Sequence, residues 1–148
     1  MKRILFVCTG NTCRSPMAEA ILKNYSLKGV EVKSAGLYAS KGQAASQHAR
    51  DVLADHQILH QHSSKSLSLE HIEWATHILT MTNSHVVQIN HLYPEFSNKV
   101  STLKGFVQQN LVCEDVVDPY GGLKLHYEAT FKELAELIEL LTIKLNDE

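Results

Sequence analysis

The sequence predicts an α/β fold: a three-layer sandwich in which a four-stranded parallel sheet carries helices on both faces. Short apolar runs alternate with helix-like stretches along the 148 residues, as in parallel sheets joined by crossover helices. The first apolar run does not alternate with polar residues, which is typical of a strand buried on both faces. Because no linker, repeat or low-complexity tract breaks the pattern, we expect a single domain over residues 1–148.

The first half of the chain contains two expected strands and two expected helices. Ile4–Cys8 is the buried strand, and a helix runs from Ser15 to about Lys28, with Pro16 tolerated in its first turn. These are followed by a strand at Glu31–Ala35, a loop from Gly36 to Ala45 and a helix from about Ser46 to His56.

The second half continues the alternation. A third buried strand, a helix and a short fourth strand are expected at Thr76–Met81, Asn83–Leu92 and Lys99–Thr102. A last helix, from about Leu123 to Lys144, carries an apolar stripe of Leu134, Leu137, Ile138, Leu141 and Leu145.

Composition and charge limit the partners and the cellular location that we expect. The net charge of -2 leaves no broad basic face, so we expect neither a nucleic acid nor a membrane as a partner. Lys2 and Arg3 precede only five apolar residues, too few for a signal peptide or a membrane span, and we expect a cytoplasmic protein. An odd number of cysteines, three, does not form a structural disulfide framework.

The segment between the first strand and the first helix has the features of an anion-binding loop. Its residues are Cys8, Thr9, Gly10, Asn11, Thr12, Cys13, Arg14 and Ser15. Backbone N–H groups of such a loop converge at a helix N-terminus, whose dipole favours negative charge. Arg14 adds a planar guanidinium that suits two phosphate oxygens. The same positive surroundings would stabilise the thiolate of Cys8, which makes Cys8 a candidate nucleophile.

The residues on either side of this loop decide between two interpretations of it. A cysteine and an arginine at this spacing form a weak signal alone. In the plain structural alternative, Cys8 is a buried residue at a strand end and Arg14 is a solvated helix residue. A strand before the loop, Gly10 in the turn and Ser15 at the expected helix cap favour the anion-binding interpretation.

Asp118 is the candidate general acid and base. Pro119, Gly121 and Gly122 make its segment a loop rather than a helix. An isolated Asp-Pro pair usually marks only a turn, but a cysteine-based dephosphorylation needs a group that protonates the leaving group and then activates water. Together with the Cys8 loop, the pair predicts a catalytic acid.

The loop from Cys8 to Ser15, the following Pro-Met-Ala-Glu, and Asp118-Pro119-Tyr120 together resemble the low-molecular-weight protein phosphatase family over the whole chain. The resemblance implies a four-stranded parallel sheet, no metal or other cofactor, and a phosphocysteine intermediate. It makes Cys8 the nucleophile, Arg14 the phosphoryl-binding residue and Asp118 the acid and then the base. It further implies that Ser15 hydrogen-bonds Cys8, and that Asn11 holds the loop with support from Ser34.

Two positions bear on the substrate, which we expect to be a phosphorylated protein. Tyrosine-directed members resemble one another in a bulky aliphatic residue at the place of Thr12 and a second aromatic at the place of Gly121. This sequence instead resembles the bacterial branch that acts on phosphoarginine, and Thr12 and Asp118 suit a polar guanidinium. We expect a protein arginine phosphatase, with a tyrosine phosphatase as the alternative and Thr12, Tyr38 and Tyr120 lining the cleft.

Cys13 and the remaining cysteine suggest further alternatives. Cys13 could trap oxidised Cys8 in a reversible disulfide, or it is simply a small buried hydrophobe. A thiol-dependent arsenate reductase would need two further cysteines close together, whereas only Cys113 remains. An inactive phosphate-binding adaptor is disfavoured because the nucleophile, arginine and acid are all present.

Histidines are numerous, nine in all, but their spacing does not indicate a metal site. His56, His60 and His62 lack an acidic residue at a recognised zinc spacing, and we expect them to be solvated or capping side chains. By the family resemblance, His62 supports the loop beneath the site. The sequence carries no signal for oligomeric state, and we expect a monomer.

Overall fold

The computed structural model describes residues 1–108 and 114–148 and contains the predicted sheet. Its four strands are all parallel and lie in the order β2-β1-β3-β4. They span Lys2–Cys8 (β1), Val30–Gly36 (β2), His77–Thr80 (β3) and Val100–Thr102 (β4). Each connection between successive strands contains at least one helix, as is usual for parallel strands.

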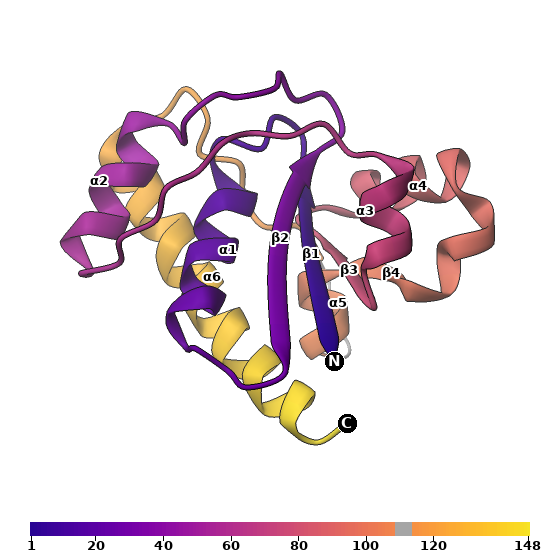
Figure 1. Cartoon of the computed structure of the whole chain (residues 1–148). Coiled ribbons are helices and arrows are strands. Elements are labelled where there is room, and N and C mark those ends of the chain that lie inside the picture. The colour runs from indigo at the N-terminus through magenta and orange to yellow at the C-terminus, as the bar shows by residue number, and fades with distance from the viewer. Residues whose placement is uncertain (109–113) are drawn as a thin grey trace.

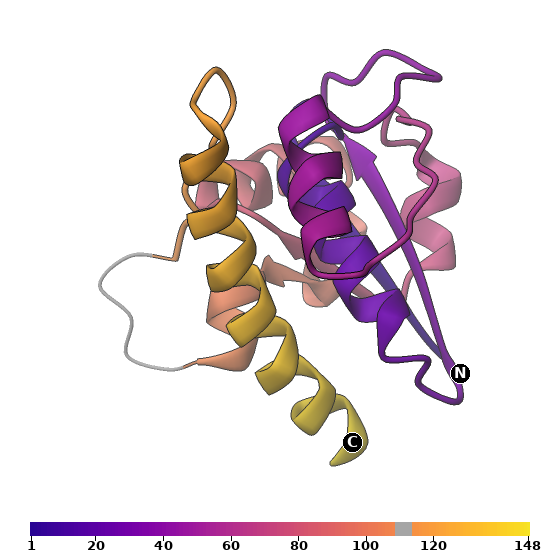
Figure 2. The same cartoon turned by 90° about the vertical axis from the view of Figure 1, so that its left-hand side faces the viewer.

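Helices cover both faces of the sheet, which confirms the three-layer prediction (Figures 1 and 2). One face carries α1 (Arg14–Asn24), α2 (Gln47–Asp55), α5 (Leu103–Val107) and α6 (Lys124–Asn146). The other carries α3 (Leu69–Trp74), α4 (Asn83–Leu92) and the 3₁₀ helix η1 (Pro94–Lys99). Within the described residues, no helix combines the length and the apolar character needed to cross a bilayer.

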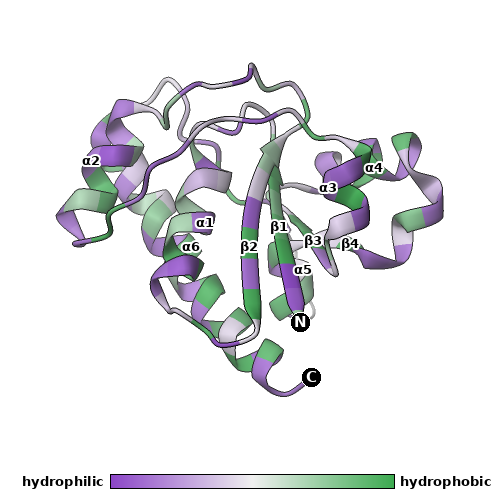
Figure 3. Cartoon of the chain, viewed as in Figure 1, coloured by the Kyte–Doolittle hydropathy of each residue, from purple (hydrophilic) through white to green (hydrophobic). Residues whose placement is uncertain are grey.

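The two halves of the core meet at β1. Ile4 and Phe6 pack into the cluster beneath α1, α2 and α6, while Leu5 and Val7 point into the cluster beneath α3 and α4. Figure 3 accordingly shows β1 as largely hydrophobic and β2, at the sheet edge, as alternating. All five residues of the stripe predicted on the last helix are buried, because α6 lies along α1 and α2.

The boundaries of the predicted elements agree with the structure within one or two residues, except at the end of the first helix. Asn83–Leu92 matches α4, whereas the first helix ends at Asn24 rather than near Lys28. Ser26 takes a positive φ of 52° there, which no helical residue can adopt.

Three short elements were not predicted. These are α3, α5 and η1, each of five or six residues and too short to show a helical period. Ser68 and Thr102 cap α3 and α5 with their side chains, so local hydrogen bonds rather than an apolar stripe define these helices.

Gly36, the last residue of β2, brings that strand against the loop that follows β1. A Cβ atom at position 36 would lie 2.6 Å from the Thr9 carbonyl oxygen and 2.9 Å from the Asn11 nitrogen. Leu37 and Tyr38 donate backbone hydrogen bonds to the carbonyls of Cys8 and Thr9. The carboxyl ends of β1 and β2 are therefore locked together where ligands bind in parallel sheets.

We expect Gly36→Ala to destabilise the protein by about 1–3 kcal/mol, because the added methyl group meets backbone atoms that cannot rotate away. Urea unfolding of the purified protein measures this change. Gly10→Ala is the matched control, since a Cβ at position 10 finds its nearest atom at 3.7 Å. Equal stability of the two variants would contradict the close-approach argument.

Candidate active site

The loop from Cys8 to Ser15 joins β1 to α1 at the carboxyl edge of the sheet. The helix begins at Arg14, with Cys13 at the N-cap position and no side-chain capping bond. The sequence suggested that Ser15 caps the helix. In the structure, Ser15 lies in the first turn instead and does not cap it. The uncapped N–H groups of that turn remain available to an anion, and the helix dipole adds to their positive potential.

Asn11 holds the shape of the loop. Its φ is 55°, in the left-handed region that asparagine tolerates better than most residues. Its side-chain amide donates to Ser15 Oγ at 2.8 Å and to Ser34 Oγ at 2.9 Å, and its Oδ1 accepts from the Lys65 N–H at 3.0 Å. Asn11 is fully buried, so these bonds fix both its conformation and the path of the loop.

The hydrogen-bond directions below Cys8 follow from the Asn11 amide. Ser15 Oγ accepts from Asn11 and lies 2.8 Å from Cys8 Sγ, so its own proton is available to that sulfur. Likewise Ser34 Oγ accepts from Asn11 and donates to Glu19 Oε1 at 2.6 Å. The Ser15 hydroxyl is thus placed to donate to the Cys8 sulfur when that sulfur acts as a nucleophile.

Arg14 is buried and reaches across to the segment that precedes the candidate acid. Its Nη1 donates to the Val116 carbonyl at 3.0 Å, and its Nη2 lies 3.5 Å from Asp118 Oδ2. The guanidinium is thus held in one orientation, with further N–H groups left for a ligand.

The segment just before Asp118 is attached to the rest of the fold. Val116 donates its N–H to the Met81 carbonyl beyond β3, and the Val117 carbonyl lies 3.4 Å from the Thr130 hydroxyl of α6, whose shorter hydrogen bond, at 3.1 Å, goes to the His126 carbonyl. The Asp118 Oδ1 accepts from the Tyr120 N–H at 3.0 Å, which leaves Oδ2 facing Arg14. The half-exposed carboxylate therefore stands at the mouth of the site.

A cavity of about 290 Å³ opens above Cys8 and brings most of the predicted residues together. Tyr38 and Tyr120 form exposed walls, with 75% and 76% of their surface accessible. The cavity is lined by Cys8, Thr9, Gly10, Thr12, Cys13, Arg14, Tyr38, Ser40, Gln43, Asp118 and Tyr120. Asn11, Ser15 and Ser34 lie beneath it as buried supports. Ser40 and Gln43 were not predicted, because nothing in their local sequence marks a binding role.

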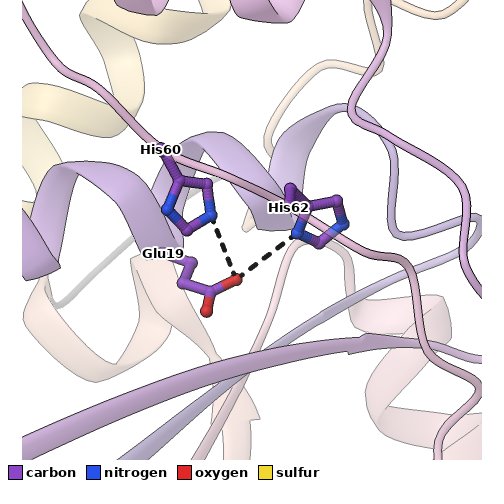
Figure 4. Close-up of side chains that lie close together, drawn as sticks. All are labelled: Glu19, His60 and His62. Carbon is purple, nitrogen blue, oxygen red and sulfur yellow. Dashed lines mark ion pairs between the residues drawn. The ribbon is translucent and has the colours of Figure 1, made fainter.

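The histidines of the 60–62 segment are not solvated, which corrects the sequence-based expectation. The side chains of His60 and His62 are only 8% and 4% exposed, and both point at Glu19 of α1 (Figure 4). His60 Nε2 and His62 Nδ1 lie 3.6 and 3.7 Å from Glu19 Oε1, while His62 Nε2 donates to the Asn11 carbonyl at 2.6 Å. His62 thereby supports the loop, as the family resemblance implied.

Glu19 is the buried anion beneath the site. Although burial alone would raise its pKa, the nearby imidazoles of His60 and His62, the Lys23 ammonium and the Ser34 hydroxyl hold the pKa of this carboxyl well below its usual range. Two histidines and a carboxylate within 4.8 Å are also a geometry that a metal ion can use. Ser34 and Lys23 already occupy the Glu19 oxygens, however, so the described contacts account for the carboxylate without a metal.

The thiol of Cys13 contacts α6 and the N-cap residue of α2. Its Sγ lies 3.4 Å from Tyr127 Oη of α6 and 3.7 Å from Ser46 Oγ, whereas Cys8 Sγ faces Ser15. Burial, with a further contribution from Cys13, raises the pKa of Tyr127 to about 12. Both thiols are free, and Cys113 lies outside the described residues.

His85, at the start of α4, was not predicted as a site residue. Its Nε2 lies 3.0 Å from Thr9 Oγ1. Burial, together with the charge of Arg14, lowers the pKa of His85 to about 4, so the imidazole is neutral at pH 7. The contact joins residues 76 positions apart, which no local pattern reveals.

Fold and site together define a class: α/β proteins that hold an anion over a cysteine at the end of the first strand. Comparison with known families makes this specific, since the model of the family described as "Low molecular weight phosphotyrosine protein phosphatase" matches residues 3–148. The chain belongs to this family.

Individual relatives fall on two sides of the family. The chain is 51% identical to a protein-arginine-phosphatase of Geobacillus stearothermophilus, over 99% of this chain and 97% of the relative. It is 41% identical to the protein-arginine-phosphatase of Bacillus subtilis, over 96% and 95%. It is 37% identical to the low molecular weight protein-tyrosine-phosphatase PtpB of Staphylococcus aureus, over 98% and 97%.

Solved structures agree with this grouping. The YwlE arginine phosphatase of G. stearothermophilus superposes with a TM-score of 0.96 at 50% identity, over 99% of this chain and 94% of the other. A cysteine-to-serine mutant of YwlE arginine phosphatase with a phosphorylated active-site serine gives 0.93 at 40% identity, over 99% and 97%.

Glu19→Gln should change how stability depends on pH. The pKa of Glu19 is lowered on folding, so its contribution to stability is complete at neutral pH and is lost as the pH falls below about 4.5, the value of the unfolded chain. Below that pH, the free energy of unfolding of the parent should fall more steeply than that of the variant, by up to about 1.4 kcal/mol per pH unit.

Urea unfolding at a series of pH values measures this difference in slope. Glu31→Gln, an exposed carboxyl on β2, is the matched control. Parallel curves for the parent and Glu19→Gln would refute a depressed pKa at Glu19.

Proposed function

We propose that this protein is a cysteine-dependent phosphatase that hydrolyses phosphoarginine in proteins through a phosphocysteine intermediate. The observation that carries the proposal is the Cys8 thiol at the base of the loop, 2.8 Å from the Ser15 hydroxyl and below a cavity that Arg14 and Asp118 share. The identity of 51% to a protein-arginine-phosphatase over 99% of the chain supports the choice of substrate.

In the first step, the Cys8 thiolate attacks phosphorus as the bond to the leaving nitrogen breaks. Asp118 gives its proton to that nitrogen, and the arginine side chain of the substrate protein leaves with the electron pair of the P–N bond. Arg14 and the loop N–H groups hold the equatorial oxygens, where charge must be stabilised in phosphoryl transfer. Ser15 stabilises the attacking sulfur, so positioning and charge supply most of the acceleration.

In the second step, a water molecule attacks the phosphocysteine. Asp118, now a carboxylate, takes a proton from that water, and the P–S bond breaks with its electron pair returning to Cys8. Inorganic phosphate leaves, and the thiolate and the acid are restored. A single carboxyl thus acts in both directions, which its place at the cavity mouth permits.

Thr12 is the residue we assign to substrate choice. It lines the cavity together with Asp118, so a hydroxyl and a carboxylate can meet the guanidinium of the leaving group. Gly121, which stands where tyrosine-directed members have a second aromatic residue, does not line this cavity. Its φ of 79° explains the glycine as a requirement of the turn, so Gly121 is weaker support for substrate choice than Thr12.

A tyrosine phosphatase is the second candidate. Tyr38 and Tyr120 form exposed aromatic walls that would suit a phenyl ring, and the PtpB relative of S. aureus is named a protein-tyrosine-phosphatase. Both functions use the same nucleophile, arginine and acid, and differ only in the leaving group.

The remaining expectations stay predictions: a cytoplasmic monomeric single domain with phosphorylated proteins as partners. The reversible disulfide between Cys8 and Cys13 also stays a prediction. In it, a sulfenic acid formed on Cys8 by a peroxide condenses with the Cys13 thiol, releasing water and forming a disulfide. Cys13 must first leave its contact with Tyr127.

Purified protein should release phosphate faster from phosphoarginine peptides than from phosphotyrosine peptides when both are offered together. Phosphate release and peptide mass spectrometry measure the ratio, with Cys8→Ser as the inactive control. A preference for phosphotyrosine would favour the second candidate, and no release from either by the folded protein would overturn phosphatase activity.

Replacement of Thr12 should shift that ratio. Thr12→Ile removes the hydroxyl and adds an apolar surface, so we expect phosphotyrosine to gain on phosphoarginine by about tenfold or more in kcat/KM. Thr12→Val, nearly isosteric, tests loss of the hydroxyl alone, and Thr12→Ser keeps it. If all three variants show the ratio of the parent, Thr12 does not determine specificity.

A further inference from the structure

His85 is a buried imidazole behind the loop that the proposed reaction leaves unused. It lies in the first turn of α4, where Thr82 at the N-cap accepts its backbone N–H. Only 4% of its surface is exposed, and its Nε2 reaches Thr9 Oγ1 at 3.0 Å. The Nδ1 atom is buried as well, and no hydrogen-bond partner for it exists within residues 1–108 and 114–148.

The unpartnered Nδ1 selects one arrangement of protons. If Thr9 donated to Nε2, the imidazole proton would sit on Nδ1 as a buried donor without an acceptor, which is costly. If the proton is on Nε2, His85 donates to Thr9 and Nδ1 keeps only a lone pair. A doubly protonated ring would again leave a donor unpaired, and burial, together with the charge of Arg14, lowers the pKa of His85. The neutral Nε2–H form is therefore favoured.

This arrangement leaves the Thr9 hydroxyl proton to be placed. Thr9 Oγ1 accepts from His85 and has no other protein partner in the described part of the chain. Thr9 lines the same cavity as Cys8 and Arg14, and its carbonyl is fixed by the Tyr38 N–H at 2.9 Å. A hydroxyl held from behind by one donor presents its own proton on the open side, which is the cavity.

We propose that His85 is a positioning residue that turns the Thr9 hydroxyl into an additional hydrogen-bond donor for the phosphoryl group. Backbone N–H groups and Arg14 supply the other donors to the phosphoryl oxygens. The inference rests on the proposed function, since it assigns a role at the same anion-binding loop. His85, which positions this donor, comes from the opposite layer of the sheet, because α4 and α1 cover different faces.

Direct binding of orthovanadate, which mimics the five-coordinate phosphoryl group, tests this inference without relying on turnover. Isothermal titration should show about tenfold weaker vanadate binding for Thr9→Val and for His85→Ala, the effect of losing one hydrogen bond to a charged ligand. The double variant should be no weaker than either single one, because both changes remove the same donor.

Two further variants separate positioning from general damage to the fold. His85→Gln keeps a side-chain N–H near the place of Nε2 and should recover most of the vanadate affinity. His91→Ala, an exposed histidine on the same helix, should bind as the parent does. Thermal unfolding checks that each variant is folded, and proton–nitrogen NMR of the imidazole rings in the parent should find His85 with its proton on Nε2.

Each outcome decides a separate point. Parent-like affinity of His85→Ala, multiplied losses in the double variant, or a proton on Nδ1 would overturn the role of His85. If the vanadate pattern appears but no phosphate is released from phosphoarginine peptides, the proposed substrate fails while the role of His85 stands. If phosphoarginine is hydrolysed and neither variant alters vanadate binding, the role of His85 fails alone.

Discussion

The left-handed conformation of Asn11 is the constraint on which the rest of the site depends. A single residue at φ 55° turns the loop, and its amide connects the loop, the start of α1, the end of β2 and the segment around Lys65. Strain of this kind persists only where the surroundings over-determine it. Two of these hydrogen bonds also affect hydroxyl groups: Ser34 accepts from Asn11 and donates to Glu19, and Ser15 accepts from Asn11 while its proton is available to Cys8. One conformational restriction therefore fixes both the path of the backbone and the polarity of the groups beneath Cys8.

A buried negative charge complements this polarity. The site collects positive potential from Arg14, the N-terminus of α1 and the loop N–H groups, which suits an anionic ligand but is costly to hold empty. Glu19 lies on α1, one turn beyond the loop, and is connected to the loop through Ser34 and His62. Burial of an ion without partners is unfavourable, and its cost here is offset by hydrogen bonds from Ser34 and Lys23 and by the nearby imidazoles of His60 and His62. The fold thus holds the positively charged loop and the Glu19 carboxylate in fixed positions relative to each other.

What could be predicted from the sequence was what neighbouring residues determine. The loop, β1 and the apolar stripe of α6 are each continuous segments, and their patterns were sufficient. The family resemblance added the roles of Asn11 and Ser34, whose contact is not local. His60 and His62 were misjudged as solvated because the carboxylate they face, Glu19, belongs to a distant helix. His85 carried no signal because its contact with Thr9 crosses the sheet. Ser15 was placed at the cap because serine favours that position, whereas here its hydroxyl is engaged by Asn11 and Cys8.

The attachment of the Asp118 loop to α6 has a consequence for the order in which the protein is made. The nucleophile and its anion-binding loop leave the ribosome before α6, which contacts the segment preceding Asp118 and packs on α1 and α2. A nascent chain that ends before this helix lacks the eight buried residues that α6 adds to the core and the support that it gives to the acid's segment. Synthesis from the N-terminus therefore produces the reactive cysteine well before the full surroundings of the acid are complete.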